Sequence, residues 1–170
     1  MNFEQLATII TSTHQQLQQS AVKAVNQYQT VRNWLMGFYI VEFEQNGEDR
    51  AQYGEELLKK LEQKVNQKGL NVTLFQRSRM FYGTYPRFCT LIEKMFTSSI
   101  YASAMHKLDG NSNSPIYASL MHKLQITDNQ SDSRDEIEPI KLINSISFTH
   151  FIELMKIDNP VKRMYYEMLT

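Results

Sequence analysis

The sequence is poor in cysteine, proline and glycine. Its 170 residues include one cysteine, Cys89, so an internal disulfide framework is excluded. Six glycines and four prolines are too few for the many turns of a β-sandwich or barrel, but they are compatible with long helices. Hydrophobic residues make up 42% of the chain, which is enough for the core of one domain. The composition therefore favours a single all-α domain that needs no oxidising environment.

Long apolar runs and a basic N-terminal segment are also lacking. The first basic residue is Lys23, so no charged region precedes an apolar core as it does in a secretory signal. The longest uncharged apolar run covers residues 34–41, whereas a membrane-spanning helix needs about 20 such residues. We therefore expect a soluble, cytoplasmic protein with no membrane association.

The sequence has no excess of charge of either sign. Lys plus Arg and Asp plus Glu each number 18, which excludes a globally basic nucleic-acid binder. Residues 42–56 nevertheless carry six acids against one base, a net charge of −5, and residues 128–138 carry five acids against one base, a net of −4. Residues 59–94 between them carry eight bases against two acids, a net of +6. This pattern indicates either solvated helix faces with local ion pairs, or a basic surface for a polyanion flanked by acidic stretches that limit non-specific binding.

Apolar residues predict a long N-terminal helix. They recur at mostly three- and four-residue steps from Phe3 to Phe43, the helical period, and Asn46-Gly47 provides an end. We expect one helix or two nearly collinear ones. Over about 40 residues such a helix spans about 60 Å, which one small domain cannot bury along its whole length. Either it packs against later helices and a partner, or its N-terminal third projects.

The next two helices are predicted over residues 48–67 and 72–85, joined by a short turn. Gly69 is expected as a left-handed C-cap of the first helix, Asn71 as the N-cap of the second and Pro86 as its stop. Helix, short glycine-containing turn and helix is the layout of a helix-turn-helix. On a helical wheel the second helix has a core-facing arc and an outer arc. The core arc holds Leu74, Phe75, Ser78, Phe81, Tyr82 and Tyr85, and the outer arc is centred on Thr73, Gln76 and Met80.

Two arginines flank the outer arc. Arg77 and Arg79 lie about 160° apart, so they cannot both reach one base edge but could touch two phosphates. Arg79 also lies close to the Phe75 side, where it could instead form a structural ion pair with one of the upstream acids. The candidate nucleic-acid-binding residues are Lys68, Thr73, Gln76, Arg77 and Arg79.

Residues 97–140 are expected to be a variable insertion. The segment 98–108 returns as 114–124 with nine of eleven positions identical, a duplication of the pattern IYASxMHKL. Two copies are too few for a solenoid, and each has the apolar spacing of a short amphipathic helix. Residues 126–139 have the composition of an acidic loop. After the insertion, segments 147–156 and 160–169 predict two C-terminal helices, the second capped by Asp158.

Catalytic motifs are missing. The sequence has no GxxxxGK[ST], GxGxxG or HExxH, and its cysteine and four histidines lack metal-ligand spacing, so we expect no metal and no cofactor. His150 is interpreted as a buried, hydrogen-bonded histidine rather than a catalytic base. Glu42 and Glu44 are interpreted as solvated acids. No active site is predicted.

Two blocks of sequence resemble a known family. The first covers residues 33–61 (N-x-W-L-M-G … G-E-E-L-L-K-K-L) and continues as G-L-N (69–71), R-S-R-M-F-Y (77–82) and Y-P (85–86). The second is S-F-T-H-F-I-E-L-M-K-I-D-N-P-V-K-R-M-Y-Y-E (147–167). In this order they resemble the N-terminal domain of the YhcG-like bacterial proteins, which carry a PD-(D/E)XK-type nuclease domain at the C-terminus. The resemblance covers about half of the chain.

The resemblance implies an all-helical N-terminal module with a helix-turn-helix-like unit, and the duplicated segment 98–124 lies outside the family pattern. With the helical patterns above, we expect a single domain over residues 1–170 with a long N-terminal helix, a helix-turn-helix-like unit, the insertion and two C-terminal helices. Such a module would be non-catalytic and would target DNA for a nuclease domain normally in the same chain. The nuclease residues are not in this sequence, so no nuclease activity is expected. Val72 to Leu74 and Met80 stand where the family often carries basic or polar residues, which weakens the case for DNA reading. The alternative is a protein-interaction or oligomerisation module, forming a homo-oligomer through the long N-terminal helix with no direct nucleic-acid contact.

Overall fold

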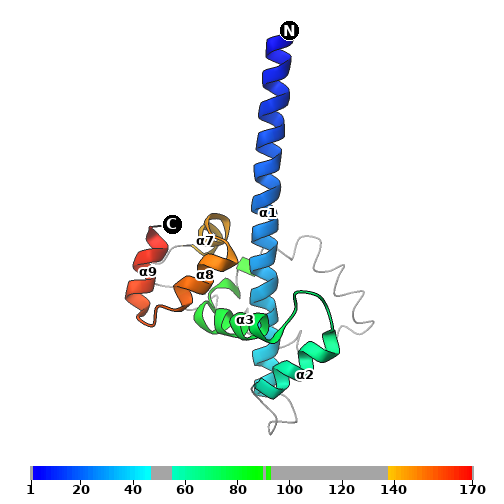
Figure 1. Cartoon of the computed structure of the whole chain (residues 1–170). Helices are drawn as coiled ribbons and strands as arrows, with labels where there is room; N and C mark the ends of the chain where they lie inside the picture. The colour runs from blue at the N-terminus through cyan, green and yellow to red at the C-terminus, as the bar shows by residue number, and fades with distance from the viewer. Residues whose placement is uncertain (1, 47–54, 90, 93–137, 170) are drawn as a thin grey trace.

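The computed structural model describes residues 2–46, 55–89, 91–92 and 138–169. Within these ranges all regular structure is helical, which confirms the all-α prediction (Figure 1). The duplicated segment and nearly all of the acidic loop lie outside the described residues. The helices in chain order are α1 (Phe3–Asn46), α2 (Glu55–Val65), α3 (Val72–Thr84), α7 (Pro139–Ser145), α8 (Phe148–Met155) and α9 (Pro160–Met168). Among the described helices, none is both long enough and apolar enough to cross a membrane.

Helix α1 is one continuous helix over the 44 residues Phe3–Asn46, which confirms the predicted long N-terminal helix. Its predicted end at Asn46-Gly47 falls at the limit of the described residues. At 1.5 Å per residue it is about 66 Å long. Its N-terminal half projects away from the other helices (Figure 1). Every side chain from residue 2 to residue 23 is exposed, and the first buried one is Thr30. The sequence left open whether α1 is packed along its length or projects at its N-terminus, and in the structure it projects. The projecting part is about half of the helix rather than the expected third.

The C-terminal half of α1 crosses α3 in close contact. At the crossing, Gly37 of α1 faces the main chain of Ser78 in α3, and a Cβ atom added at Gly37 would lie 1.9 Å from the Ser78 carbonyl oxygen. Trp34 and Phe38 flank this glycine, and both rings pack edge-on against Tyr82 with centroid distances of 5.1 and 5.5 Å. The missing side chain at residue 37 lets the two backbones meet and brings these aromatic rings together.

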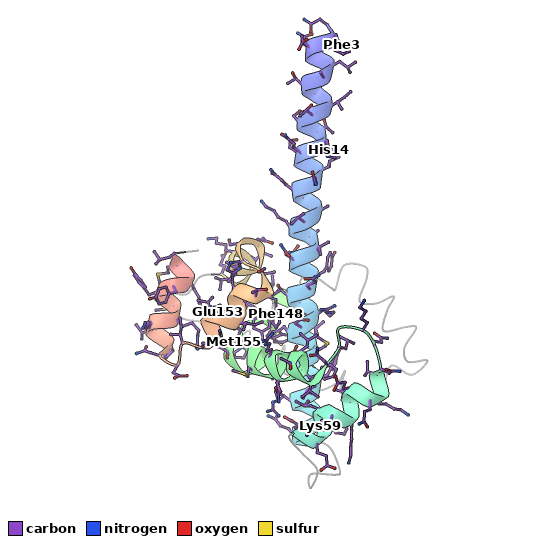
Figure 2. The ribbon with its side chains drawn as sticks, viewed as in Figure 1. Phe3, His14, Lys59, Phe148, Glu153 and Met155 are labelled. Atoms are coloured by element: carbon purple, nitrogen blue, oxygen red, sulfur yellow. The ribbon has the colours of Figure 1, made fainter. Side chains whose placement is uncertain are left out.

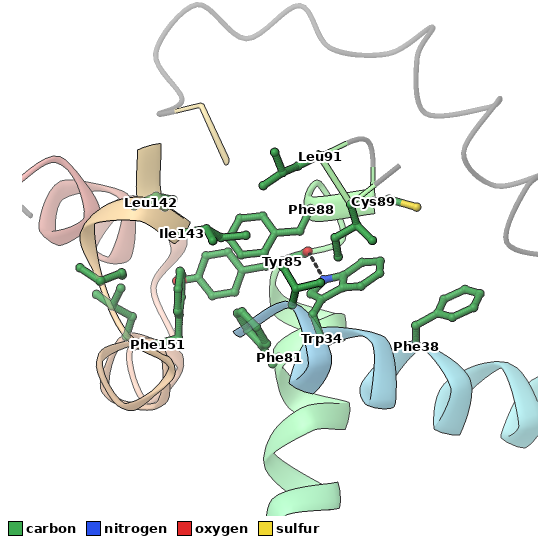
Figure 3. Close-up of a cluster of buried hydrophobic side chains, with 14 of the residues drawn as sticks. Trp34, Phe38, Phe81, Tyr85, Phe88, Cys89, Leu91, Leu142, Ile143 and Phe151 are labelled. Carbon is green, nitrogen blue, oxygen red and sulfur yellow. Dashed lines mark hydrogen bonds between the residues drawn. The ribbon is translucent and has the colours of Figure 1, made fainter. Parts of the chain in front are cut away.

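The main core is aromatic and joins α1, α3, α7, α8 and residues 85–92 (Figure 3). Phe81 of α3 lies within it and packs against four other rings, those of Tyr85, Phe88, Phe148 and Phe151, in edge-on or tilted geometry with centroid distances of 4.9 to 5.6 Å. The Trp34 indole N–H donates a hydrogen bond of 2.8 Å to the Tyr85 carbonyl oxygen. This bond satisfies both buried groups, which is what burial of an indole requires.

A second, smaller core fixes α2. Its fully buried members come from three helices: Ile40 of α1, Leu58 of α2 and Phe75 of α3. The partly buried residues Met36, Leu61, Leu70 and Val72 pack around them. Helix α2 and the connection to α3 are therefore held against α1, so the residues of the predicted helix-turn-helix-like unit have defined positions.

The C-terminal helices α8 and α9 lie where the sequence predicts them, whereas the short helix α7 was not predicted. Two local details differ. The N-cap of α9 is Asn159, whose side chain accepts from the backbone N–H groups of Val161 and Lys162 at 2.9 and 3.1 Å, and not Asp158. His150 is exposed rather than buried, because it lies in the first turn of α8, where its Nδ1 accepts from the Ser147 backbone N–H at 3.3 Å.

Candidate nucleic-acid interface

The connection between α2 and α3 begins at Asn66. Helix α2 ends at Val65, two residues before the predicted end, and Asn66 follows it with a positive φ of 44°. Its N–H still bonds to the Glu62 carbonyl at 2.9 Å. Asparagine tolerates this left-handed conformation better than most residues. The predicted left-handed cap at Gly69 is therefore wrong, because Asn66 takes that role.

Gly69 instead shapes a β-turn that presents Lys68. The Leu70 N–H donates to the Gln67 carbonyl at 3.0 Å, which closes a turn over residues 67–70. Gly69 is at the third position with φ of 89°, the conformation that a type II turn requires there. Lys68 is at the second position and is exposed. The predicted candidate Lys68 thus lies at the tip of the connection.

The N-terminal part of α3 carries three further candidates. The helix begins after Asn71, whose side chain accepts from the Leu74 N–H at 2.8 Å, as the predicted N-cap. Thr73 and Arg77 are exposed one turn apart, and Gln76 between them is half-buried. The wheel placed these three side chains outward, and the structure keeps Thr73 and Arg77 there.

Arg79 forms an ion pair with α1 instead. Its Nη1 donates to Oε1 of Glu44 at 2.8 Å, and the Glu44 side chain is only 18% exposed. This is the structural alternative considered for Arg79, and it takes Arg79 out of the candidate interface. The prediction that Glu42 and Glu44 are solvated is wrong, since Glu42 is also buried, at 1% exposure.

Arg87 is likewise paired, with the C-terminal helix. Its Nη2 lies 2.6 Å from Oε2 of Glu167, while Nε of Arg163 lies 4.0 Å from the other carboxylate oxygen. Glu167 is 3% exposed. Sequence reasoning missed this acid, although the four-residue spacing from Arg163 is a signal for a pair on one helix face. The paired arginines Arg79 and Arg87 therefore contribute little to the net positive charge of residues 59–94.

Tyr85 lies between the two arginines that contact Glu167. The guanidinium carbons of Arg87 and Arg163 are 5.7 and 5.8 Å from its ring centroid, within the range of cation–π contacts. Burial, and then the negative charge of Glu167, raise the pKa of Tyr85 well above its usual range. The hydroxyl is close enough to feel this carboxylate but falls outside the geometry of a well-formed hydrogen bond. These contacts attach α9 to the end of α3.

The remaining basic side chains are on α2, the turn and α3. Residues 59–77 carry five bases against one acid, Glu62, a net charge of +4. Lys60 and Glu56 form an exposed pair at 3.5 Å, which is worth little in water. The other four bases, Lys59, Lys64, Lys68 and Arg77, are exposed. Lys59 is seen on α2 in Figure 2. Such side chains can contact phosphate groups.

Residues suited to other chemistry are not gathered in the described part of the chain. It holds no group of three or more His, Cys, Asp or Glu residues that could hold a metal ion. Cys89 is buried in the main core, away from solvent. The basic side chains of α2, the turn and α3 are therefore the candidate site that the described residues offer.

The comparisons with known proteins agree with the first of the two blocks of motifs. The family model described as the DUF1016 N-terminal domain matches residues 9–132, well over half of the chain. The matched residues include the duplicated segment 98–124, which was expected to lie outside the family pattern, and do not include the second block at 147–167. This match fits the resemblance to the N-terminal domain of YhcG-like proteins. Neither the curated proteins nor the solved structures gave a match. The chain therefore belongs to the DUF1016 N-terminal domain family.

Proposed function

We propose that this domain is a non-catalytic targeting module that binds nucleic acid through phosphate contacts from α2, the turn 67–70 and α3. The observation that carries the proposal is the charge left after ion pairing. Lys59, Lys64, Lys68 and Arg77 are exposed, and no ion pair is formed by any of them within the part of the chain that the structure describes. The resemblance to YhcG-like proteins supports the targeting part of the proposal. In that family the module is followed by a PD-(D/E)XK-type nuclease domain, which the module would direct to DNA.

The chemistry of this surface favours the nucleic-acid backbone over base edges. With Arg79 bound to Glu44, one arginine of α3 remains exposed, and the neighbouring outward residue Met80 is apolar and 53% exposed. Phosphate contacts position a protein on nucleic acid without reading its sequence. About four such contacts give non-specific affinities on the order of micromolar or weaker, with strong salt dependence.

Fluorescence anisotropy of the full chain with labelled duplex and single-stranded DNA at low salt tests this function. Lys68→Ala and Arg77→Ala should each weaken binding roughly threefold to tenfold, by similar factors on different sequences. Lys162→Ala is the matched control, because Lys162 is an exposed lysine on α9 and its loss changes the net charge equally. The proposal is wrong if no DNA binds at high micromolar protein, or if Lys162→Ala weakens binding as much as the other two.

The alternative function, a protein-interaction or oligomerisation module, is favoured by a separate observation. Large apolar side chains are exposed along the projecting half of α1, among them Phe3 at 79% and Leu17 at 66%. These residues do not belong to the basic surface, so the two functions are compatible in one molecule.

A further inference from the structure

The projecting part of α1 exposes apolar side chains that no other described helix covers. We call residues 3–25 the α1 arm. Phe3, Leu6, Ile10, Leu17 and Val25 are 79, 38, 59, 66 and 55% exposed. In Figure 2 the side chains along this part of α1 project away from the rest of the fold. A row of large apolar groups left in water at this spacing marks an interaction surface rather than scattered surface residues.

Six apolar residues of the arm lie on one narrow stripe. At 100° per residue, Phe3, Leu6, Ile10, Leu17, Ala21 and Ala24 fall within an arc of about 60°, whereas Ile9, Val22 and Val25 lie about 40–100° beyond its edges. Gln19 and Gln15 lie on the opposite side, at about 160° from Leu17. A stripe this narrow is the geometry by which a helix packs along one other helix.

The charges of the arm indicate what kind of partner fits it. From residue 3 to residue 31 the only acid is Glu4 and the only base is Lys23, so the net charge is zero apart from His14. The arm therefore offers no attraction to a polyanion or to a strongly acidic or basic protein surface. A second copy of the same helix meets no net repulsion.

The stripe is also symmetric about its middle. Measured from the midpoint between Thr13 and His14, Phe3 mirrors Ala24, Leu6 mirrors Ala21 and Ile10 mirrors Leu17. The two charged residues, Glu4 and Lys23, mirror each other about the same midpoint. Two antiparallel copies related by a two-fold axis at this midpoint would therefore place the apolar residues of the stripe at the level of apolar residues. Glu4 and Lys23 each lie about 130° from the centre of the stripe, so they stay in solvent and do not oppose the pairing. Such self-complementarity is what a two-fold interface requires.

We propose that two copies of this chain associate as an antiparallel dimer through their α1 arms. The overlap runs from residue 3 to residue 24 and stops before Thr30, the first buried residue of the folded body. The two bodies then sit at opposite ends of the paired arms. A parallel pair would instead crowd the two bodies together at one end of the paired arms. This inference rests on α1 alone and is independent of nucleic-acid binding.

The apolar area that the paired stripes bury determines the expected affinity of the dimer. Fully burying one large apolar side chain removes roughly 60–120 Å² of apolar surface, so the four large residues of the stripe on each copy bury roughly 500–1,000 Å² in total. Specific interfaces bury about 1,200–2,000 Å² in total, polar atoms included. With its flanking polar residues the arm reaches the lower part of that range, which predicts a dimer that dissociates on dilution through the micromolar range.

Sedimentation velocity of the full chain over a range of concentrations tests the association. The unmodified chain should pass from monomer to dimer as its concentration rises through the micromolar range. Leu17→Lys should weaken the dimer at least tenfold, because it places a charge in the apolar seam of each copy. Gln19→Lys is the matched control, since it adds the same charge two residues away on the opposite side of the arm, and it should leave the dimer within about twofold of the unmodified chain.

Both variants change exposed positions outside the body, so circular dichroism and thermal melts of the body report whether it stays folded. A chain that stays monomeric at high micromolar concentration, a larger assembly, or a dimer that survives Leu17→Lys would each overturn the proposal. A dimer weakened equally by Gln19→Lys would also overturn it, because the stripe would then not be the contact.

Cysteine cross-linking tests the direction of the arms. Copies with Leu6→Cys mixed with copies with Ala21→Cys should form a disulfide between the two kinds under mild oxidation. Leu6→Cys alone should not, because the two introduced thiols are then about 22 Å apart along an antiparallel pair. Native Cys89 is buried and does not compete. Efficient cross-linking of Leu6→Cys alone would overturn the antiparallel arrangement.

Discussion

Gly37 of α1 and Ser78 of α3 meet backbone to backbone. A Cβ atom at Gly37 would lie 1.9 Å from the Ser78 carbonyl oxygen and 2.6 Å from its carbon. The neighbour is main chain, so no rotamer change can make room, and the two helices would have to separate. This crossing holds the helix that carries the arm against the helix that carries Arg77. The stability of the body should therefore depend on it.

Replacing this glycine by alanine should destabilise the fold. We expect Gly37→Ala to lower the free energy of unfolding by at least about 2 kcal/mol, in the range of severe overpacking. Urea denaturation followed by the fluorescence of Trp34, the only tryptophan and a buried residue, measures it. Gly83→Ala is the control, because nothing lies within 4 Å of a Cβ added there, and it should be neutral or stabilising by up to about 1 kcal/mol. Equal stability of the two variants would contradict the close crossing.

The buried carboxylate of Glu167 should matter more than an exposed one. Glu167→Gln removes the charge that Arg87 and Arg163 face, and because both arginines keep some contact with solvent we expect a loss of about 1–3 kcal/mol in thermal or urea unfolding. Glu153→Gln is the matched control. Glu153 pairs with Lys156 at 2.8 Å with both side chains 64% exposed, so solvent screens the pair and its loss should cost less than about 0.5 kcal/mol. A larger effect from Glu153→Gln would refute this account of α9.

The raised pKa of Tyr85 predicts that the folded chain loses stability at alkaline pH. Its pKa is raised in the fold by burial and by Glu167, so the neutral phenol is favoured there. Below the ordinary pKa of 10.0 both states are neutral and this contribution is complete. As the pH rises above that value the unfolded state loses its proton while the folded state keeps it, and the free energy of unfolding falls by up to about 1.4 kcal/mol per pH unit.

Comparison with Tyr85→Phe isolates this contribution, because the other tyrosines and the lysines titrate equally in both proteins. Urea denaturation at about pH 9 and about pH 11 should show that the unmodified chain loses roughly 1 kcal/mol more than the variant. Parallel losses in the two proteins would mean that Tyr85 ionises in the fold as it does in water.

The structural features that the sequence predicted correctly are those that depend on residues close together in the chain. The Asn71 cap, the outward placement of Thr73 and Arg77 and the long helix α1 follow from residue types and a 3.6-residue period. Ion pairs between distant segments are not encoded this way. Arg79 and Glu44 are 35 residues apart, and their contact depends on how α3 crosses α1.

The same reason accounts for the other differences at the candidate interface. Arg87 and Glu167 are 80 residues apart, so a count of charges along the chain could not show that Arg87 is neutralised. The burial of Glu42 likewise depends on tertiary packing, not on the local helical pattern. The basic region predicted from the sequence is present as a charge count. Within the residues that the structure describes, its exposed bases without an ion pair are Lys59, Lys64, Lys68 and Arg77, all within 59–77.

The most direct measurement is the salt dependence of DNA binding by the full chain with Arg77→Ala and Arg79→Ala. About four phosphate contacts, from Lys59, Lys64, Lys68 and Arg77, predict a slope of log affinity against log salt near −3.6 for duplex DNA. Arg77→Ala should make that slope shallower by about one, whereas Arg79→Ala should leave it unchanged, because Arg79 is already bound to Glu44. Two results would contradict a phosphate-binding surface formed by α2, the turn and α3. One is a slope that becomes shallower in Arg79→Ala but does not change in Arg77→Ala, and the other is binding that does not respond to salt.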